Sequence, residues 1–154
     1  REAGGVPAFI GYGSPPFPSA LCVSVNSCVV HGIPSGYKFC KGDIVGLDIG
    51  MVYETLFTDM ARTVAVGPVS PREKQLIDAT YASLDHALTV IRPGATTGDI
   101  GHAVQSYIER LGFGVVRDLA GHGVGHELHE SPEVPNFGKP GSGEKLVPGM
   151  VLAI

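Results

Sequence analysis

The chain has 154 residues and a net charge of −4, with 44% hydrophobic and 17% charged residues. This composition supports a sizeable core and excludes an intrinsically disordered chain. The negative charge disfavours a polyanionic partner, and no apolar run is long enough for a transmembrane helix, so the sequence predicts neither direct nucleic-acid binding nor membrane insertion.

The cysteines indicate the cellular setting of the protein, and the two chain ends predict that the sequence is part of a longer protein. Cys22, Cys28 and Cys40 are an odd number without the paired spacing of a zinc site, which suits a reducing, cytoplasmic setting. Residues 1–5 are typical of a helix tail, and residues 150–154 are an apolar strand with no polar residue after it. We therefore expect a fragment, a single domain over residues 1–154 that lacks an N-terminal helix and its last strands.

The first third of the chain predicts one irregular segment and one strand. Residues 6–20 are rich in proline, glycine and aromatic side chains, which favours irregular structure. Tyr12 and Phe17 within this segment are either loop anchors, the favoured interpretation, or the wall of an apolar pocket. Residues 21–25 alternate apolar and small side chains, which predicts a strand. His31 follows before a Gly-Ile-Pro turn, a position from which it could face a cleft.

Two aspartates stand out in the next apolar segments. Two or three strands are predicted over residues 43–49, 51–57 and 61–66. Asp48 lies inside an apolar run, where an unpaired carboxylate would cost on the order of several kcal/mol that metal coordination would remove. Asp59 also has apolar flanks, although a salt bridge to Arg62 is an alternative. Because the chain reverses between them, both carboxylates can come together on neighbouring strands.

Two helices follow, and both are interpreted as scaffold. The first begins with a capping box at Ser70–Glu73 and stops at Pro93-Gly94. Thr97 is predicted to cap the second, which Gly112 ends. His86 and His102 lie on these helices as surface residues. The helices carry apolar faces composed of Leu76, Ile77, Tyr81, Leu84, Leu88 and Ile91 in the first and Ile100, Ala103, Val104, Tyr107, Ile108 and Leu111 in the second.

Residues 121–132 read Gly-His-Gly-Val-Gly-His-Glu-Leu-His-Glu-Ser-Pro, between a short strand predicted at residues 114–117 and a loop at residues 134–141. Imidazole and carboxylate are ligands for zinc, manganese, iron or cobalt, and glycine lets the backbone approach closely. The glycines favour a loop or a bent strand over a helix, and a solvated polar loop is the alternative to a site. Together with Asp48 and Asp59, this stretch predicts a centre for one or two divalent ions, which is equipment for hydrolysis.

In order and spacing, these motifs resemble type I methionine aminopeptidase, a metallopeptidase of the pita-bread fold. The matching segments are residues 21–26, 30–34, 42–45 with Asp48, Thr58-Asp59, 121–125, 128–132 and 148–150. The resemblance implies an α/β fold of the α+β type, a curved antiparallel sheet with helices on its outer face and metals on its concave side. It implies a metallo-aminopeptidase that removes the initiator methionine, prefers small second residues, and uses two divalent ions chosen from Co, Mn, Fe, Ni or Zn.

The resemblance also implies roles for individual residues. Asp48 would bind one metal ion, Asp59 would bridge both ions, and His122 would bind the other. His129 would donate a hydrogen bond to the scissile carbonyl and stabilise the tetrahedral intermediate. His31 would contact the substrate at the scissile amide.

Other positions carry the resemblance further or depart from it. Tyr12, Phe17 and Cys22 resemble the methionine side-chain pocket, with Phe17 where a tyrosine is common. Ser27-Cys28 stands where the family commonly has Glu-Val. Two further glutamate ligands of the family are not present among the 154 residues, so we expect this piece to be inactive alone.

The resemblance also sets the expected partners and the alternatives. The implied partners are nascent polypeptide N-termini at the ribosome, in the cytoplasm, and a monomer is expected for the full-length protein. An Xaa-Pro dipeptidase of the same fold and a non-catalytic module with this fold are the alternative functions.

Overall fold

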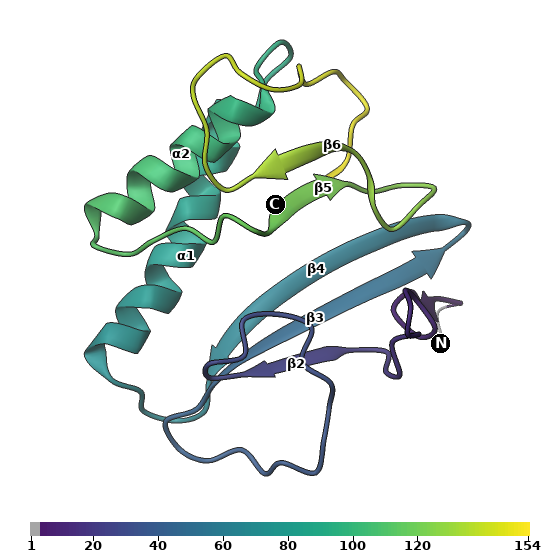
Figure 1. Ribbon diagram of the computed structural model, residues 1–154, viewed down its shortest axis with the longest axis vertical. Helices are drawn as coiled ribbons and strands as arrows, with labels where there is room; N and C mark the ends of the chain where they lie inside the picture. Colours follow the sequence, from purple (N-terminus) through teal and green to yellow (C-terminus); the bar gives the residue numbers. More distant parts are fainter. Residues whose placement is uncertain (1–3) are drawn as a thin grey trace. The chain divides into compact units, whose positions relative to one another are not determined.

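A computed structural model of the chain describes residues 4–154. The helix tail predicted at residues 1–5 falls mainly on residues outside this range. The described elements, in chain order, are β1 (Val6–Pro7), β2 (Cys22–Val25), β3 (Ile44–Tyr53), β4 (Leu56–Ala65), α1 (Pro71–Val90), α2 (Thr97–Arg110), β5 (Ala120–Gly123), β6 (Glu130–Pro135) and β7 (Leu152–Ala153) (Figure 1). They form two compact units. Among the described residues, the first unit comprises residues 4–74 and 125–128, and the second comprises residues 75–124 and 129–154.

The first unit is built on an antiparallel sheet in which β3 pairs with β1, β2 and β4. β3 and β4 pair without interruption from Ile44 opposite Ala65 to Tyr53 opposite Leu56. Glu54 and Thr55 close the hairpin with positive φ angles of 47° and 72°, a turn whose twist matches that of the strands. The predicted irregular segment at residues 6–20 contains the short edge strand β1, where a proline is tolerated.

The sequence predicts two or three strands here and the structure has two, but the predicted bounds are wrong: Gly50 lies inside β3, and the predicted strand at residues 51–57 contains the hairpin turn. Glycine usually weakens a strand, but here it admits a neighbour. A Cβ atom at Gly50 would lie 2.5 Å from Cε1 of Phe9, whose ring packs over this position. The backbone N–H of Ala8 donates to the Gly50 carbonyl at 2.9 Å. The glycine is therefore a site of close packing rather than a turn.

Replacing Gly50 with alanine in the full-length protein is expected to lower the free energy of unfolding by about 1–3 kcal/mol, because the buried Phe9 ring must move. Gly46→Ala is the matched control on the same strand, since its Cβ would meet Ser24 at an ordinary 3.6 Å. This control should change stability by no more than about 0.5 kcal/mol. Urea unfolding of the two variants measures the difference, and equal effects would contradict the packing argument.

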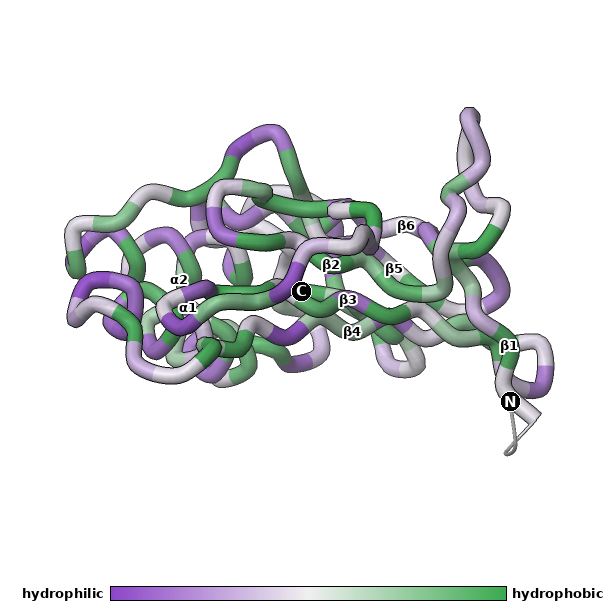
Figure 2. The backbone as a smooth tube through the Cα atoms, turned by 90° about the horizontal axis from the view of Figure 1, so that it is seen from below, coloured by the Kyte–Doolittle hydropathy of each residue, from purple (hydrophilic) through white to green (hydrophobic). Residues whose placement is uncertain are grey.

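The second unit has its core between α1, α2 and the segments that follow them. Its buried apolar residues are Ala79, Ala87, Ala95, Ile100, Val104, Ile108, Val134 and Leu146. The predicted face of α2 is confirmed by burial of Ile100, Val104 and Ile108. On α1 the buried stripe is instead Ala79, Ser83 and Ala87, with Leu76, Leu84 and Leu88 exposed beside it. Small side chains thus occupy the packed face of α1. Figure 2 shows hydrophobic and hydrophilic residues interspersed along the helical part of the chain.

Capping fixes the helix starts. The predicted box before α1 is confirmed: Glu73 N–H donates to Ser70 Oγ at 3.2 Å, and Ser70 N–H donates to Glu73 Oε2 at 2.8 Å. The cap of α2 is Thr96 rather than the predicted Thr97, because Thr96 has the extended backbone of a cap residue and Asp99 reciprocates its hydrogen bond. Gly112, with φ of 73°, follows the end of α2 as predicted.

The Asp99 carboxylate predicts a pH dependence of stability. The Thr96 N–H, then the N–H of Gly141 and the Thr96 hydroxyl, hold the pKa of Asp99 below its ordinary value of 3.8. A lowered folded-state pKa means that the unfolded chain binds the proton more tightly. The stabilisation is therefore complete above pH values near 3.8 and is lost as the pH falls through the lower folded-state pKa.

Asp99→Asn should therefore be less stable than the parent at neutral pH, and the difference should shrink in acid. Urea unfolding of the full-length protein at a series of pH values measures it. Asp85→Asn, which removes an exposed carboxylate from α1, is the control and should show little difference at any pH. A difference for Asp99→Asn that stays constant with pH would contradict the linkage.

The second unit also holds a three-stranded antiparallel sheet in the order β6-β5-β7. The strand predicted at residues 114–117 is wrong, because pairing begins at Ala120, inside the glycine-rich stretch. A Cβ atom at Gly121 would clash with the carbonyl oxygen of Ala153, and one at Gly123 with that of Ser131. Close approach of these backbones explains how a sequence of low strand propensity forms the central strand.

The loop and the strand predicted toward the end of the chain are both present, with one changed boundary. The loop predicted at residues 134–141 begins two residues later, because β6 continues through Val134 and Pro135 opposite Gly121 and Ala120. The predicted last strand is confirmed as the short β7. Within residues 4–154, no helix has both the length and the apolar character needed to cross a lipid bilayer.

Candidate metal centre and substrate pocket

The two aspartates of the first unit share one face of its sheet. Asp48 lies on β3 opposite Ala61, and Asp59 lies on β4 opposite Gly50. Directly opposed residues share a face, as do residues two apart on one strand, so the carboxylates are diagonal neighbours. The same alternation places Arg62, opposite Leu47, on the other face of the sheet. The sheet register therefore groups the carboxylates with each other rather than with Arg62.

An apolar cluster lies on the same face as the carboxylates. Cys22 is directly opposite Asp48 across the β2–β3 pair, and the Phe9 ring covers Gly50, which is opposite Asp59. Phe9, Cys22 and Leu128 are the buried members, and partly buried Ala8, Phe17 and Phe57 pack against them. The rings of Phe9 and Phe17 meet edge to face with centroids 6.4 Å apart. The cluster is an apolar wall beside two acidic groups.

This cluster contains two of the three predicted pocket residues. Phe17 and Cys22 belong to it, whereas Tyr12 is 47% exposed and lies outside it. Sequence reasoning missed Phe9, Leu128 and Phe57 as wall residues. The available signal was weak: Leu128 is an apolar residue directly before His129 inside a polar stretch, and Phe9 precedes Tyr12 in the aromatic segment.

The thiol of Cys22 is chemically quiet in this setting. Burial first, then the negative charges of Asp48 and Asp59, raises the pKa of Cys22 from 9.0 to about 11. A thiol with this pKa is protonated at neutral pH and is a poor nucleophile. Cys22 therefore serves as a small apolar wall residue, as the sequence predicted.

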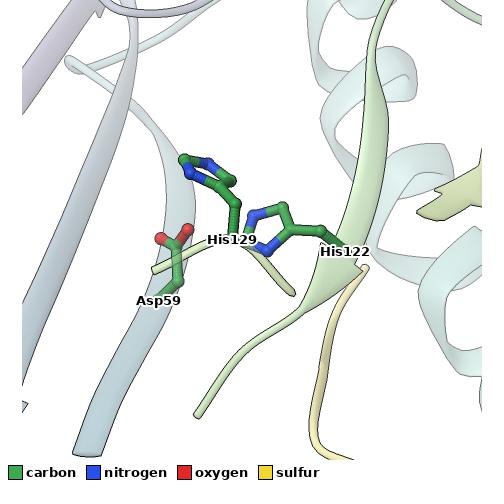
Figure 3. Close-up of side chains that lie close together, drawn as sticks. All are labelled: Asp59, His122 and His129. Carbon is green, nitrogen blue, oxygen red and sulfur yellow. The ribbon is translucent and has the colours of Figure 1, made fainter. Parts of the chain in front are cut away.

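The second unit contributes a pair of imidazoles. His122 lies on β5, and His129 lies immediately before β6. Their rings are in contact, with centroids 4.3 Å apart and planes tilted by 60° (Figure 3). The register of β5 and β6 shifts between His122 and Gly123, and this irregularity falls at the pair.

The hydrogen bonding of His122 defines its tautomer. Its Nδ1 atom lies 2.9 Å from the carbonyl oxygen of Gly123. A carbonyl oxygen only accepts, so Nδ1 carries a hydrogen and donates it, and Nε2 is the nitrogen left to meet a metal ion. Metal-binding histidines are commonly oriented by such a bond from their second nitrogen. The half-buried His122 thus has the tautomer that a metal ligand needs.

The remaining histidines are distributed over the surface. His31 is exposed in the segment between β2 and β3 and has a positive φ of 56°. His126 is exposed within residues 125–128, which belong to the first unit. His86 and His102 are exposed on α1 and α2, which confirms their prediction as surface residues; the His86 ring lies 4.3 Å from the Tyr107 ring.

Each unit carries donors of the kind that divalent transition-metal ions bind. Asp59 projects from β4 of the first unit, and His122 and His129 belong to the second; each offers one ligand atom of the kind such ions bind (Figure 3). Mixed carboxylate oxygen and imidazole nitrogen suit Mn, Fe, Co, Ni or Zn, whereas an all-oxygen set would suit Mg or Ca.

Comparisons with known proteins agree with this chemistry. The sequence profile of metallopeptidase family M24 matches residues 2–154. The methionine aminopeptidase of Clostridium acetobutylicum is 45% identical over 155 residues, which cover 100% of this chain and 61% of that relative. The chain therefore spans about three-fifths of the length of this relative.

Solved structures give the same relationship. The methionine aminopeptidase from Thermotoga maritima has a TM-score of 0.92 at 48% identity, covering 96% of this chain and 59% of that one. Prolidase from Pyrococcus furiosus has a TM-score of 0.76 at 25% identity, covering 86% of this chain and 39% of that one.

These likenesses confirm the predicted mixed α/β architecture and the pita-bread fold. Members of a metallopeptidase family bind divalent metal ions, which agrees with carboxylates on β3 and β4 and a correctly tautomerised imidazole on β5. The match extends over all the described residues, and the chain belongs to metallopeptidase family M24.

Proposed function

We propose that this chain is part of a metal-dependent aminopeptidase that removes the initiator methionine from nascent proteins. The observation that carries the proposal is the sharing of one sheet face by Asp48, Asp59 and an apolar cluster. Acidic ligands beside an apolar wall suit a substrate whose unbranched, apolar side chain lies next to the bond to be cut. Relatives named as methionine aminopeptidases, at 45% and 48% identity, support it more strongly than a prolidase at 25%.

Asp48 and Asp59 from the first unit and His122 from the second are proposed to hold two divalent ions, of Co, Mn, Fe, Ni or Zn. The tautomer of His122 supports its part, and the shared face of the aspartates supports theirs. The chain passes from one unit to the other close to the histidines. Residues 125–128 belong to the first unit, and the residues directly before and after them in the sequence belong to the second. A bound divalent ion would polarise the substrate carbonyl and lower the pKa of water.

The chain's own side chains then orient the substrate. His129 is proposed to donate a hydrogen bond to the scissile carbonyl oxygen, and this bond strengthens as negative charge develops there. His31 is proposed to contact the scissile amide. Phe17 and Cys22, with Phe9 and Leu128 of the same cluster, would surround the methionine side chain. Tyr12 is exposed and lies between Phe9 and Phe17 in the sequence, and it is also proposed to contact the methionine side chain.

The proposal extends to the substrate class and its source. Peptides with a small second residue are the proposed substrates, and nascent N-termini emerging from the ribosome in the cytoplasm are the natural ones. The full-length protein is proposed to act as a monomer.

The direct test uses the full-length protein, stripped of metal with a chelator and then titrated with Mn²⁺ or Co²⁺. Methionine release from Met-Gly-Met should appear with added metal and be absent before it. An Ala-Pro dipeptide is the parallel substrate and should remain intact. Cleavage of Ala-Pro without methionine release would identify an Xaa-Pro dipeptidase instead. Metal binding without cleavage of either peptide would identify a non-catalytic module.

A further inference from the structure

The segment between β2 and β3, residues 26–43, has no regular secondary structure and carries His31; we call it the His31 loop. His31 itself is exposed and holds the left-handed backbone conformation, with φ of 56°. This conformation is uncommon for a non-glycine residue and costs free energy that the surrounding contacts must offset. The contacts that close the loop therefore decide where the His31 imidazole lies.

One anchor lies immediately after His31. The backbone N–H of Val23 on β2 donates to the Gly32 carbonyl at 2.8 Å, and Gly32 N–H donates to Ser24 Oγ at 3.1 Å. A Cβ atom at Gly32 would clash with the carbonyl oxygen of Val23, so only glycine can lie this close to the strand. This anchor ties one point of the loop to the edge of the sheet.

A second anchor is the carboxylate of Asp43, a buried residue with only 6% of its surface exposed. Oδ1 accepts a hydrogen bond from Asn26 Nδ2 at 2.9 Å. Oδ2 accepts one from the Cys40 N–H at 2.8 Å and one from the Tyr37 hydroxyl at 3.0 Å. Asn26 Oδ1 in turn accepts from the Ile44 N–H at 3.0 Å. One carboxylate thus connects Asn26, the first residue of the loop, to Tyr37 and Cys40 farther along it.

Tyr37 is the member of this network that reaches farthest into the loop. Its side chain is 51% exposed, yet its hydroxyl meets the buried Asp43 carboxylate. Its ring also packs edge to face with Phe39, with centroids 6.1 Å apart. The hydroxyl ties Tyr37 and its neighbours in the loop to Asp43, whereas the exposed ring buries little apolar surface. Its hydroxyl bond therefore affects the shape of the loop more than the stability of the core.

We propose that Tyr37 is a positioning residue: its hydrogen bond to Asp43 keeps the His31 loop closed and thereby holds the His31 imidazole where it meets the substrate. The substrate contact of His31 rests on the proposed function, whereas the closure of the loop does not. His31 lies between Gly32, which is tied to β2, and Asn26, which shares the Asp43 carboxylate with Tyr37. Without the hydroxyl, the Asp43 carboxylate holds the loop less firmly at both Tyr37 and Asn26, and His31 is correctly placed for less of the time.

Tyr37→Phe in the full-length protein removes the hydroxyl and keeps the ring. We expect kcat/KM for Met-Gly-Met to fall about tenfold, the effect of losing one hydrogen bond to a charged group. The loss should lie in kcat, because the proposed metal ligands and apolar pocket are untouched. Tyr53→Phe is the matched control: Tyr53 is 48% exposed on β3, outside the loop and the proposed site.

A double-mutant cycle separates positioning from general destabilisation. Tyr37→Phe should reduce kcat in the parent but have no further effect in a His31→Ala background. Equal losses in both backgrounds would show that Tyr37 acts other than through His31 and would overturn the proposal. An unchanged kcat in the parent background would overturn it as well.

Two readouts do not depend on catalysis. Trypsin cleavage after the exposed Lys38 and Lys41 reports loop opening, and the NMR signal of the His31 ring reports its surroundings. Both should change in Tyr37→Phe and not in Tyr53→Phe; an unchanged His31 signal would overturn the proposal. If the parent protein releases no methionine, the proposed function has failed, and these readouts still decide whether Tyr37 positions His31.

Discussion

Asp59→Ala in the full-length protein is expected to remove bound metal and to abolish metal-dependent methionine release. As a proposed bridging ligand, Asp59 would contribute to both ions, so its loss should affect the whole metal centre. Metal catalysis contributes several kcal/mol to hydrolysis, and its loss corresponds to a fall in kcat/KM on the order of 10³-fold or more. Metal content by elemental analysis and turnover of Met-Gly-Met measure the two effects together.

Asp85→Ala is a suitable control for this experiment, because it removes an exposed carboxylate from α1. It should retain parental metal content and turnover. Folding of Asp59→Ala must be checked by its urea unfolding transition, and the variant is expected to fold, since the Asp59 side chain is only partly buried. Full metal content and normal turnover in Asp59→Ala would remove Asp59 from the centre and leave Asp48 without its proposed partner.

His129→Ala should give a different pattern: a fall in kcat of about 10²–10³-fold, with little change in KM or metal content. This size is typical of losing one hydrogen-bond donor to a developing oxyanion. The distinction matters because the rings of His122 and His129 are only 4.3 Å apart, and either imidazole offers a nitrogen to a metal. His122→Ala, in contrast, should lower metal content, as expected for a residue whose Nδ1 is taken up by the Gly123 carbonyl and whose Nε2 is left to bind a metal ion.

His126→Ala is the matched control for His129→Ala, since His126 is an exposed histidine three residues earlier. It should behave like the parent protein. His129→Gln should recover part of the lost kcat, because its amide N–H can also donate. Loss of metal from His129→Ala would show that His129 is a ligand and would contradict its role as a hydrogen-bond donor.

Several features follow from the sequence because local interactions determine them. Ser70 and Glu73 define the start of α1 within one turn, and the periodic Ile100, Val104 and Ile108 define the buried face of α2. The placement of Asp48 and Asp59 on paired strands follows from apolar runs separated by a chain reversal. Even here the predicted cap of α2 is one residue too late. Thr96 and Thr97 carry the same side chain, and only the backbone conformation distinguishes the cap.

Other features depend on residues distant in sequence. Gly50 reads locally as a break, and it lies inside β3 because the Phe9 ring occupies the space that a side chain would need. The strand that carries His122 likewise forms at glycines whose partners, Ser131 and Ala153, lie farther along the chain. Leu128 gives only a weak local sign of its role, which becomes clear when it packs with Phe9 and Cys22.

The sequence by itself thus determined the two helices, the carboxylate–imidazole chemistry and the resemblance to a metallopeptidase. These depend on residue type, short-range hydrogen bonding and periodicity, all of which can be read along one segment. Tertiary structure alone decided which face each carboxylate occupies, which nitrogen of His122 carries its hydrogen, and how Asp43 closes the His31 loop. These depend on strand register and on contacts between segments, and such contacts exist only once the chain has folded.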